Sequence, residues 1–238
     1  PGGDDRTGVR GRGGVQRVGG RAGQSGDDRG ADREGLQGAA DAAPHVGDVM
    51  ADFVLPDAKG MMQRLSDLLA AGPAVVSFNR GSWCPYCEVE ITAWAEQGAA
   101  LRAAGARLII ITPEVGGRMT ALAAIAGQEA VVLCDVQMGV ALRNGLAFPV
   151  GPEVLSGFLA DGFDLAEVNG TQSGFLPVPA TFLLDRDRVV KFAFVEPDFS
   201  RRAEPAEVLA ALRQASGFSS AGEAPSPPAP LPRGEGSA

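Results

Sequence analysis

One stretch of the sequence joins a buried strand, a short loop and the start of a helix, and it places two cysteines where the helix begins. Residues 74–78 are a mostly apolar run, which is typical of a strand covered on both faces. A short loop leads from this run to Cys84 and Cys87. From Cys84 to Ala104 apolar residues recur at helical spacing, and Gly105 ends the pattern. A strand that feeds directly into a helix predicts an α/β unit.

The rest of the central region alternates between the same two kinds of element. Strand patterns occupy residues 53–55, 61–65, 74–78, 108–112, 131–135, 177–184 and 189–195, and helices or helical turns are expected at 66–71, 84–104, 118–128, 139–144 and 205–215. Strands separated by helices predict a partly parallel sheet, and the final strand pair gives that sheet an antiparallel edge. We therefore expect an α/β fold, a three-layer α/β/α sandwich with a mixed central sheet.

The composition divides the chain into three parts. Residues 1–45 hold 13 Gly, with seven Arg balanced by seven Asp plus Glu, and show no apolar periodicity. Such a segment buries too little apolar surface to offset the entropy of ordering it, so we expect a disordered tail or an extension from an early translation start. Residues 217–238 are expected to form a disordered Pro-rich tail, and residues 46–216 one folded domain.

The charge and hydropathy patterns argue against two classes of function. A net charge of −8 and the lack of a basic stripe disfavour binding to nucleic acid. No apolar run approaches the roughly 20 residues that span a bilayer, and no secretory leader pattern is present. We expect a soluble cytoplasmic protein that binds neither nucleic acid nor membrane.

The two cysteines at the predicted helix start carry the chemistry. Unpaired N–H groups and the positive end of the helix dipole favour a thiolate there, so Cys84 is the expected nucleophile. Pro85 suits the first helical turn. Cys87 lies one turn on, within disulfide reach, and is expected to be the less exposed of the pair. It is placed to resolve a mixed disulfide or a sulfenic acid on Cys84.

Other interpretations of the cysteines fit the sequence less well. A zinc site needs about four ligands, and the remaining candidates are Cys134 and His45, the latter in the predicted tail. A Cys–His hydrolase would also require His45 to fold back onto the domain. Two inert core cysteines are a further alternative. Cys134, at the end of an apolar strand, is expected to be a buried inert thiol, with a second resolving cysteine as the alternative. We expect no metal, flavin or nucleotide cofactor.

Three segments in this order resemble landmarks of the thioredoxin superfamily. They are Asp52-Phe53-Val54-Leu55-Pro56-Asp57, Trp83-Cys84-Pro85-Tyr86-Cys87 and Val178-Pro179-Ala180-Thr181-Phe182-Leu183-Leu184-Asp185. More narrowly, they resemble the redoxin branch of alkyl hydroperoxide reductase and thiol-specific antioxidant (peroxiredoxin-like) proteins, over about residues 46–215. The resemblance implies a thioredoxin-like fold and thiol-based oxidoreductase activity.

The resemblance also implies roles for residues around the cysteines. Pro179 would be a cis-proline that faces the pair, and Val178 would present backbone groups to an extended substrate. Trp83 and Tyr86 would complete the active-site turn. Arg80 would supply positive charge beside the thiolate, with a solvated loop arginine as the alternative. Glu88 would shuttle a proton or, more simply, interact with the helix dipole.

Two departures from the peroxiredoxin pattern affect the reaction. Peroxiredoxins carry P-x-x-x-T/S-x-x-C at the reactive cysteine, whereas Gly81 and Ser77 occupy the Thr/Ser and Pro positions here. Pro179 stands where those proteins have an arginine at the head of the following strand. The groups expected to activate the peroxide O–O bond are therefore missing or replaced.

The sequence leaves three functions open. The leading one is a peroxiredoxin-like antioxidant enzyme that reduces peroxides or disulfides, restored by a thioredoxin-like dithiol or by glutathione. The second is a thioredoxin- or glutaredoxin-like disulfide reductase, because Cys-Pro-Tyr-Cys is also the glutaredoxin tetrad. The third is a non-catalytic binding module that senses oxidation. The aromatic-rich insertion at 147–176 would be either a lid over the substrate pocket or a connection anchored to the core.

Overall fold

The computed structural model describes residues 37–38 and 40–215. Most of the predicted N-terminal tail and all of the predicted C-terminal tail lie outside the described residues, so the division into tails and one domain stays a prediction. Within the described part of the chain, no helix is both long enough and apolar enough to cross a membrane.

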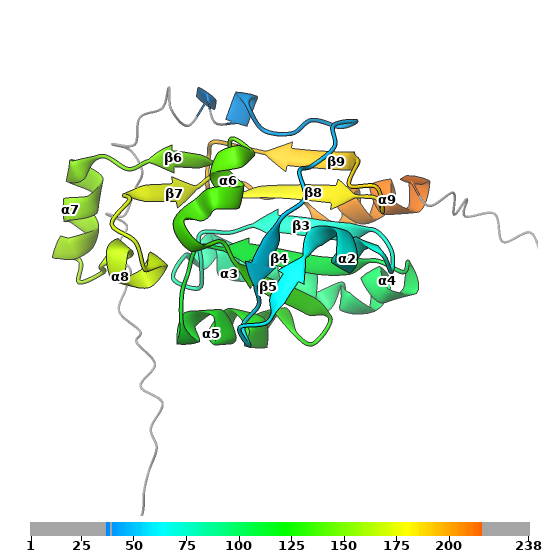
Figure 1. Cartoon of the computed structure of the whole chain (residues 1–238), viewed down its shortest axis with the longest axis horizontal. Coiled ribbons are helices and arrows are strands. Elements are labelled where there is room, and N and C mark those ends of the chain that lie inside the picture. Colours follow the sequence, from blue (N-terminus) through cyan, green and yellow to red (C-terminus); the bar gives the residue numbers. More distant parts are fainter. Residues whose placement is uncertain (1–36, 39, 216–238) are drawn as a thin grey trace, which may run out of the picture.

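A five-stranded mixed sheet forms the centre of the fold, in the strand order β5-β4-β3-β8-β9 (Figure 1). The first three strands in chain order are parallel: β3 (Ala74–Phe78), β4 (Arg107–Thr112) and β5 (Ala130–Cys134). β8 (Ala180–Leu184) pairs antiparallel with β3, and β9 (Val190–Val195) pairs antiparallel with β8. The predicted mixed sheet with an antiparallel edge is confirmed.

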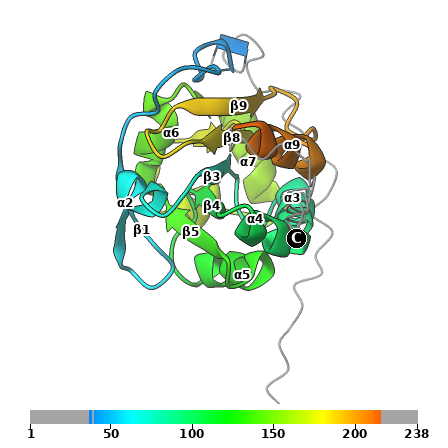
Figure 2. The ribbon, with the colours of Figure 1, turned by 90° about the vertical axis from the view of Figure 1, so that its right-hand side faces the viewer.

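Helices cover both faces of this sheet, as Figure 2 shows. Two short helices lie on one face, α2 (Leu65–Leu69) and α6 (Gly139–Arg143). Four lie on the other: α3 (Pro85–Glu96), α4 (Gly98–Ala103), α5 (Gly117–Ala126) and α9 (Pro205–Ala215). The three-layer α/β/α sandwich predicted from the sequence is confirmed.

The alternation of side chains along β3 divides the core between the two faces. Val76 and Phe78 pack with the layer that holds α2 and α6, whereas Val75 packs with the layer that holds α3. Phe78 meets Phe182 of β8 edge to face, with ring centroids 6.1 Å apart. Because all five β3 residues are buried, this strand fixes the point from which the cysteine loop departs.

Two small antiparallel ladders flank the main sheet. β1 (Val54–Pro56) pairs with β2 (Met62–Arg64), as the predicted hairpin requires. β6 (Ala147–Pro149) pairs with β7 (Phe175–Pro177) and closes the aromatic-rich insertion. Between these last two strands lie α7 (Pro152–Ala160) and α8 (Leu165–Asn169), which the sequence had left without an assignment.

Two predicted elements are each divided in the structure. The helix expected over 84–104 is broken at Gln97, whose N–H donates to the Trp94 carbonyl oxygen at 3.0 Å, before α4 begins at Gly98. Glycine loses more conformational entropy in a helix than other residues, which favours an interruption there. The strand expected over 177–184 is divided as well. Pro177 is the last residue of β7 and Ala180 the first of β8, and the two strands belong to different sheets.

The contact between the rings of Phe78 and Phe182 gives a test of the core. Phe182→Ala empties a fully buried position and should lower the free energy of unfolding by about 3–5 kcal/mol in urea denaturation. Leu159→Ala, at a side chain that is 58% exposed, is the matched control and should change it by less than about 0.5 kcal/mol. Equal losses in the two variants would contradict the packing described.

Candidate active site

Cys84 caps the N-terminus of α3, and the loop from β3 delivers it there. Its backbone is extended, with φ −90° and ψ 114°, and Pro85 occupies the first helical turn. The Cys84 carbonyl oxygen accepts the N–H groups of Cys87 and Glu88, at 3.0 and 3.1 Å. The predicted placement at the helix start is therefore found, with the helix beginning one residue later than expected. All three cysteines of the chain are free thiols.

Cys84 and Cys87 are both buried. Cys84 is 2% exposed and Cys87 is fully buried, so Cys87 is the less exposed of the pair, as expected, although Cys84 is also covered. The loop between β9 and α9 contributes to this burial. Its Phe199 ring lies 4.3 Å from the Arg80 guanidinium carbon and packs edge to face on Tyr86 at 5.6 Å.

The surroundings of the two thiols shift their pKa values in opposite directions. The hydrogen bond from the Cys87 thiol lowers the pKa of Cys84 to about 6, with help from the Arg80 and Arg202 charges and against the effect of burial. Burial raises the pKa of Cys87 well above its ordinary value, and the neighbouring Cys84 adds to that rise. Near neutral pH, Cys84 is therefore the thiolate and Cys87 the thiol.

A buried acid from the loop after β4 holds the cysteine loop in place. Glu114 accepts hydrogen bonds from Ser82 N–H at 2.7 Å and from Ser82 Oγ at 2.9 Å. Gly81 permits this approach. It has φ +132°, and a Cβ atom there would lie 2.4 Å from Glu114 Cδ. The glycine at the position where peroxiredoxins carry Thr or Ser thus makes room for the Glu114 side chain.

Trp83 joins the cysteine loop to the aromatic-rich insertion. Its indole N–H donates to the Arg80 carbonyl oxygen at 3.1 Å. Its ring packs on Phe158 at 5.8 Å and on Phe163 at 4.8 Å between centroids. These contacts attach the insertion to the cysteine loop, and its role as a lid or as an anchored connection stays a prediction.

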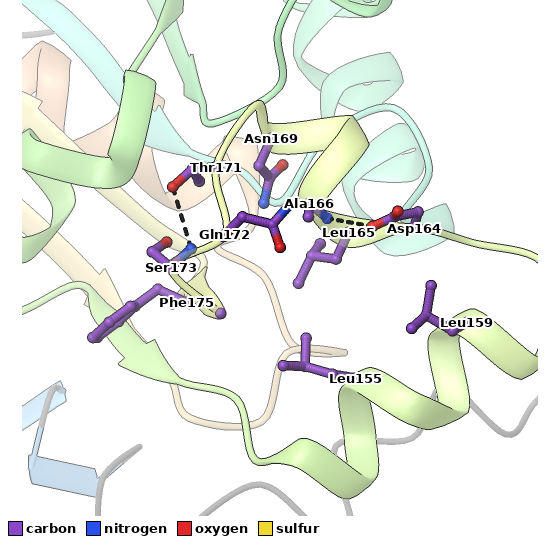
Figure 3. Close-up of a pocket in the computed structure, with 11 residues that line it drawn as sticks. Leu155, Leu159, Asp164, Leu165, Ala166, Asn169, Thr171, Gln172, Ser173 and Phe175 are labelled. Atoms are coloured by element: carbon purple, nitrogen blue, oxygen red, sulfur yellow. Dashed lines mark hydrogen bonds between the residues drawn. The ribbon is translucent and has the colours of Figure 1, made fainter.

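A pocket of about 120 Å³ lies on the insertion between α7, α8 and the segment that leads to β7 (Figure 3). Leu155 and Leu159 line one side, and the buried Asn169 side chain lies at the other. None of the cysteines lines it. This pocket is therefore separate from the cysteine site.

The implied roles of Val178 and Pro179 need correction. Among residues 37–38 and 40–215 no peptide bond is cis, so the bond before Pro179 is trans. The Val178 N–H donates to the Leu146 carbonyl oxygen at 2.7 Å, since this stretch continues the pairing of β6 with β7. That N–H is thus not available to an extended substrate.

The comparisons with known proteins agree with this geometry. The profile of the AhpC/TSA family matches residues 46–193, well over half of the chain. The chain belongs to the AhpC/TSA family. It is therefore a peroxiredoxin-like, thiol-dependent peroxidase with a thioredoxin-like fold, as the sequence resemblance implied.

This AhpC/TSA protein is similar to a curated protein and to solved structures of peroxiredoxins. A Mycobacterium tuberculosis protein, named as a candidate peroxiredoxin, is 27% identical over 71% of this chain and 96% of its own length. The crystal structure of the peroxidoxin BcpB of the same organism gives a TM-score of 0.56 at 25% identity, over 71% of this chain and 96% of that one. A mutant of peroxiredoxin 6 from Arenicola marina shares the fold, with a TM-score of 0.58 at 15% identity over 73% and 74% of the two chains.

Two residues near the cysteines of this AhpC/TSA protein escaped the sequence analysis. Arg202 donates from Nη2 to Cys87 Sγ at 3.4 Å, across 115 positions of sequence. Glu90 is buried on α3, whereas Glu88, the acid considered from the sequence, is exposed. A signal for Glu90 was present, because it lies in the stripe of Cys87, Ile91 and Trp94 that helical spacing turns toward the core.

The other candidate groups lie elsewhere in this AhpC/TSA protein. Cys134 is buried, its Sγ donates to the Glu114 carbonyl oxygen at 3.1 Å, and burial raises its pKa to about 11. His45 is exposed and pairs with Asp48 at 3.8 Å. In the part of the chain that the structure describes, no group of three or more His, Cys, Asp or Glu residues is arranged to hold a metal ion.

The lowered pKa of Cys84 gives a second prediction. The thiolate is the reactive form, so the rate of Cys84 alkylation by iodoacetamide should rise with pH through a midpoint near pH 6 and then level off, because the pKa is about 6. Cys87→Ala removes the hydrogen bond that lowers the pKa of Cys84 most, so it should move the midpoint to higher pH. Cys134→Ser should leave it in place. A wild-type midpoint at the ordinary thiol value, about 8.5, would contradict the proposed electrostatics.

The contact between Gly81 and Glu114 gives a third prediction. Gly81→Ala combines backbone strain with a clash, and it should lower stability in urea unfolding by at least about 1–3 kcal/mol. It should also raise the alkylation midpoint of Cys84, because the displaced loop carries Arg80. Gly116→Ala shares the positive φ, +68°, but has no atom within 4 Å of the added Cβ, so it is the matched control. Equal effects of the two variants would show that the clash is unimportant.

Proposed function

We propose that this peroxidase works through both cysteines, with Cys84 as the peroxidatic residue and Cys87 as the resolving one. One observation carries the proposal. A thiolate with a pKa of about 6 lies at the N-terminus of α3 and accepts a hydrogen bond from a second thiol one turn further on. A thiolate is the nucleophile that peroxide chemistry needs, and an adjacent thiol is what disulfide formation needs.

The cycle has three steps. The Cys84 thiolate attacks one peroxide oxygen, so that an S–O bond forms, the O–O bond breaks and the alkoxide or hydroxide that leaves takes up a proton. Cys87 then displaces hydroxide from the Cys84 sulfenic acid, which gives a disulfide and water. One external thioredoxin-like dithiol, or two molecules of glutathione, then reduces the disulfide by thiol exchange and is itself oxidised to a disulfide.

Arg80 supports the first step in place of the groups that this sequence lacks. Its side chain is 2% exposed rather than solvated, and its charge lowers the pKa of Cys84. A buried cation beside the thiolate also stabilises the negative charge that develops on the leaving oxygen. Trp83, Pro85 and Tyr86 complete the turn that holds Cys84 at the helix end.

A second candidate function has its own support. Gly81 and Ser77 stand at positions where peroxiredoxins place Thr or Ser and Pro, and the tetrad Cys-Pro-Tyr-Cys suits exchange with disulfides. In that case Cys84 would attack a disulfide sulfur, and Cys87 would resolve the mixed disulfide.

One experiment tests the proposal and separates the two functions. Reduced protein is mixed with one equivalent of hydrogen peroxide or of a small disulfide, and the products are followed by rapid quenching and mass spectrometry. We expect fast peroxide consumption in the wild type, none in Cys84→Ser, and a persistent sulfenic acid in Cys87→Ser that a dimedone probe traps. Cys134→Ser is the control and should match the wild type.

The same experiment can overturn the proposal in two ways. Peroxide consumption that survives in Cys84→Ser would remove the assigned nucleophile. Sluggish peroxide reaction beside rapid exchange with the small disulfide would assign the chain to the second candidate function.

A further inference from the structure

On the sheet face beneath α3, the strands β3 and β8 carry both apolar and hydroxyl side chains. Val75 of β3 and Leu183 of β8 face each other there and are fully buried. The next residues of the two strands on this face, Ser77 and Thr181, also lie directly opposite each other. The register of the two strands therefore sets two hydroxyl groups side by side on a buried face. Such a pair needs a polar partner from the helix above it.

Glu90 of α3 is that partner. Its Oε1 accepts hydrogen bonds from Ser77 Oγ at 2.7 Å and from Thr181 Oγ1 at 3.2 Å. Its Oε2 forms an ion pair with Arg202, with a distance of 2.7 Å to Nε. Glu90 itself is only 5% exposed. The carboxylate is thus fixed from the sheet on one side and from the β9–α9 loop on the other.

Arg202 connects this carboxylate to the cysteines. While its Nε faces Glu90, its Nη2 donates to Cys87 Sγ at 3.4 Å. Cys87 and Glu90 lie three residues apart on the same buried stripe of α3. The three side chains form one cluster, with a single cation between two groups that can each lose a proton. We call it the Cys87–Arg202–Glu90 cluster.

The cluster is not expected to add much to the free energy of folding. A buried ion pair loses much of its attraction to desolvation, and apolar replacements are often equally stable. Burial raises the pKa of Glu90 to about 7, with the neighbouring Cys87 adding to the rise and Arg202 opposing it. A carboxyl group that titrates near neutral pH beside a buried thiol is suited to exchange a proton with it.

The state of Cys84 controls when that exchange occurs. In the reduced protein, the negative charge of Cys84 is one of the causes that raise the pKa of Cys87. Oxidation by peroxide converts the Cys84 thiolate into a neutral sulfenic acid, so this repulsion disappears. Cys87 then ionises more readily, after Cys84 has reacted and not before.

We propose that Cys87 and Glu90 exchange one proton across Arg202 during resolution: Glu90 accepts the thiol proton while Arg202 stabilises the thiolate. The inference rests on the proposed two-cysteine cycle. The negative charge moves from Glu90 to Cys87 while the cation between them stays in place. The buried cluster therefore remains neutral overall, and no net charge is created in a medium of low polarity.

The step balances in atoms and electrons. The Cys87 thiolate attacks the Cys84 sulfur, so the S–S bond forms, the S–O bond breaks and hydroxide leaves. The hydroxide combines with the proton that Glu90 holds, which gives water and restores the carboxylate. One sulfenic acid and one thiol become one disulfide and one water, with the Cys84 sulfur reduced and the Cys87 sulfur oxidised.

A groove of about 610 Å³ gives the cluster a route for protons to solvent. Glu90 and Arg202 both line it, together with the exposed side of α3 and the start of α9. The other charged groups that face this groove are Arg201, Glu204 and Glu207. On the cysteine side, the charged or titratable neighbours of the cluster are Arg80 and Cys84.

Glu90→Gln tests the proposal, because the amide oxygen of glutamine can still accept from Ser77 and Thr181, whereas the side chain loses the ion pair with Arg202 and cannot take up the proton. Reduced protein is mixed with one equivalent of hydrogen peroxide at several pH values, and sulfenic acid and disulfide are quantified separately over time. We expect disulfide formation at pH 7 to slow by at least about tenfold and its pH profile to move to higher pH. Peroxide consumption should change by less than about twofold. Glu88→Gln, at an exposed acid on the same helix, is the matched control and should leave both steps unchanged.

The proton exchange would be overturned if Glu90→Gln still consumes peroxide and forms the disulfide at the wild-type rate and with the wild-type pH profile. That result would leave the proposed function intact. A Cys87→Ser variant that forms no sulfenic acid with peroxide would overturn the two together.

A second measurement needs no variant. In NMR titrations of the wild type, the Glu90 carboxyl and the Cys87 Cβ should respond at shared midpoints in the reduced protein. In the disulfide form, prepared by exchange with a small disulfide, Glu90 should titrate at a lower pH. Identical Glu90 titrations in the two forms would contradict the proposal, whether or not Glu90→Gln folds.

Discussion

The docking of α3 on the sheet decides which chemistry this chain can perform. The buried stripe of the helix carries Cys87 and Glu90 as well as Ile91 and Trp94, so the surface that anchors the helix also holds a thiol and an acid. The same docking aims the N-terminus of α3 at the loop from β3, and Cys84 lies at that end. The packing of Ile91 and Trp94 therefore also fixes where Glu90 meets Ser77 and Thr181.

The two replacements within the P-x-x-x-T/S-x-x-C pattern, Ser77 and Gly81, each lie against a buried acid. Ser77, at the proline position, donates its hydroxyl to Glu90, and a proline there would leave that carboxylate without this partner. Gly81, at the Thr or Ser position, leaves space that the Glu114 side chain fills. Each departure thus accompanies a buried acid, one beneath the helix and one beneath the loop. The proposed peroxidatic cysteine is thus surrounded by a polar framework that differs from the one in the peroxiredoxin pattern.

Local patterns in the sequence were sufficient for much of the fold. The apolar run at β3, the Pro-led helix α9 and the cysteines at a helix start each depend on neighbouring residues, and the structure has all three. Contacts between distant segments were not predictable in this way. Arg202 reaches Cys87 because of the path of the β9–α9 loop, which no local pattern encodes. The contacts of Phe199 of that loop with Arg80 and Tyr86 have a similar origin. Glu90 was within reach of a sequence argument, because an acid in an apolar helical stripe is unusual enough to mark a site.

The central claim is that one peroxide molecule converts Cys84 and Cys87 into a disulfide within a single chain. Peptide mapping by mass spectrometry after one equivalent of hydrogen peroxide, with free thiols blocked during the acid quench, tests it most directly. The account predicts one linked peptide that contains Cys84 and Cys87, with Cys134 recovered as a blocked thiol. A disulfide that includes Cys134, a link between two chains, or a lasting sulfenic acid with Cys87 still free would contradict it.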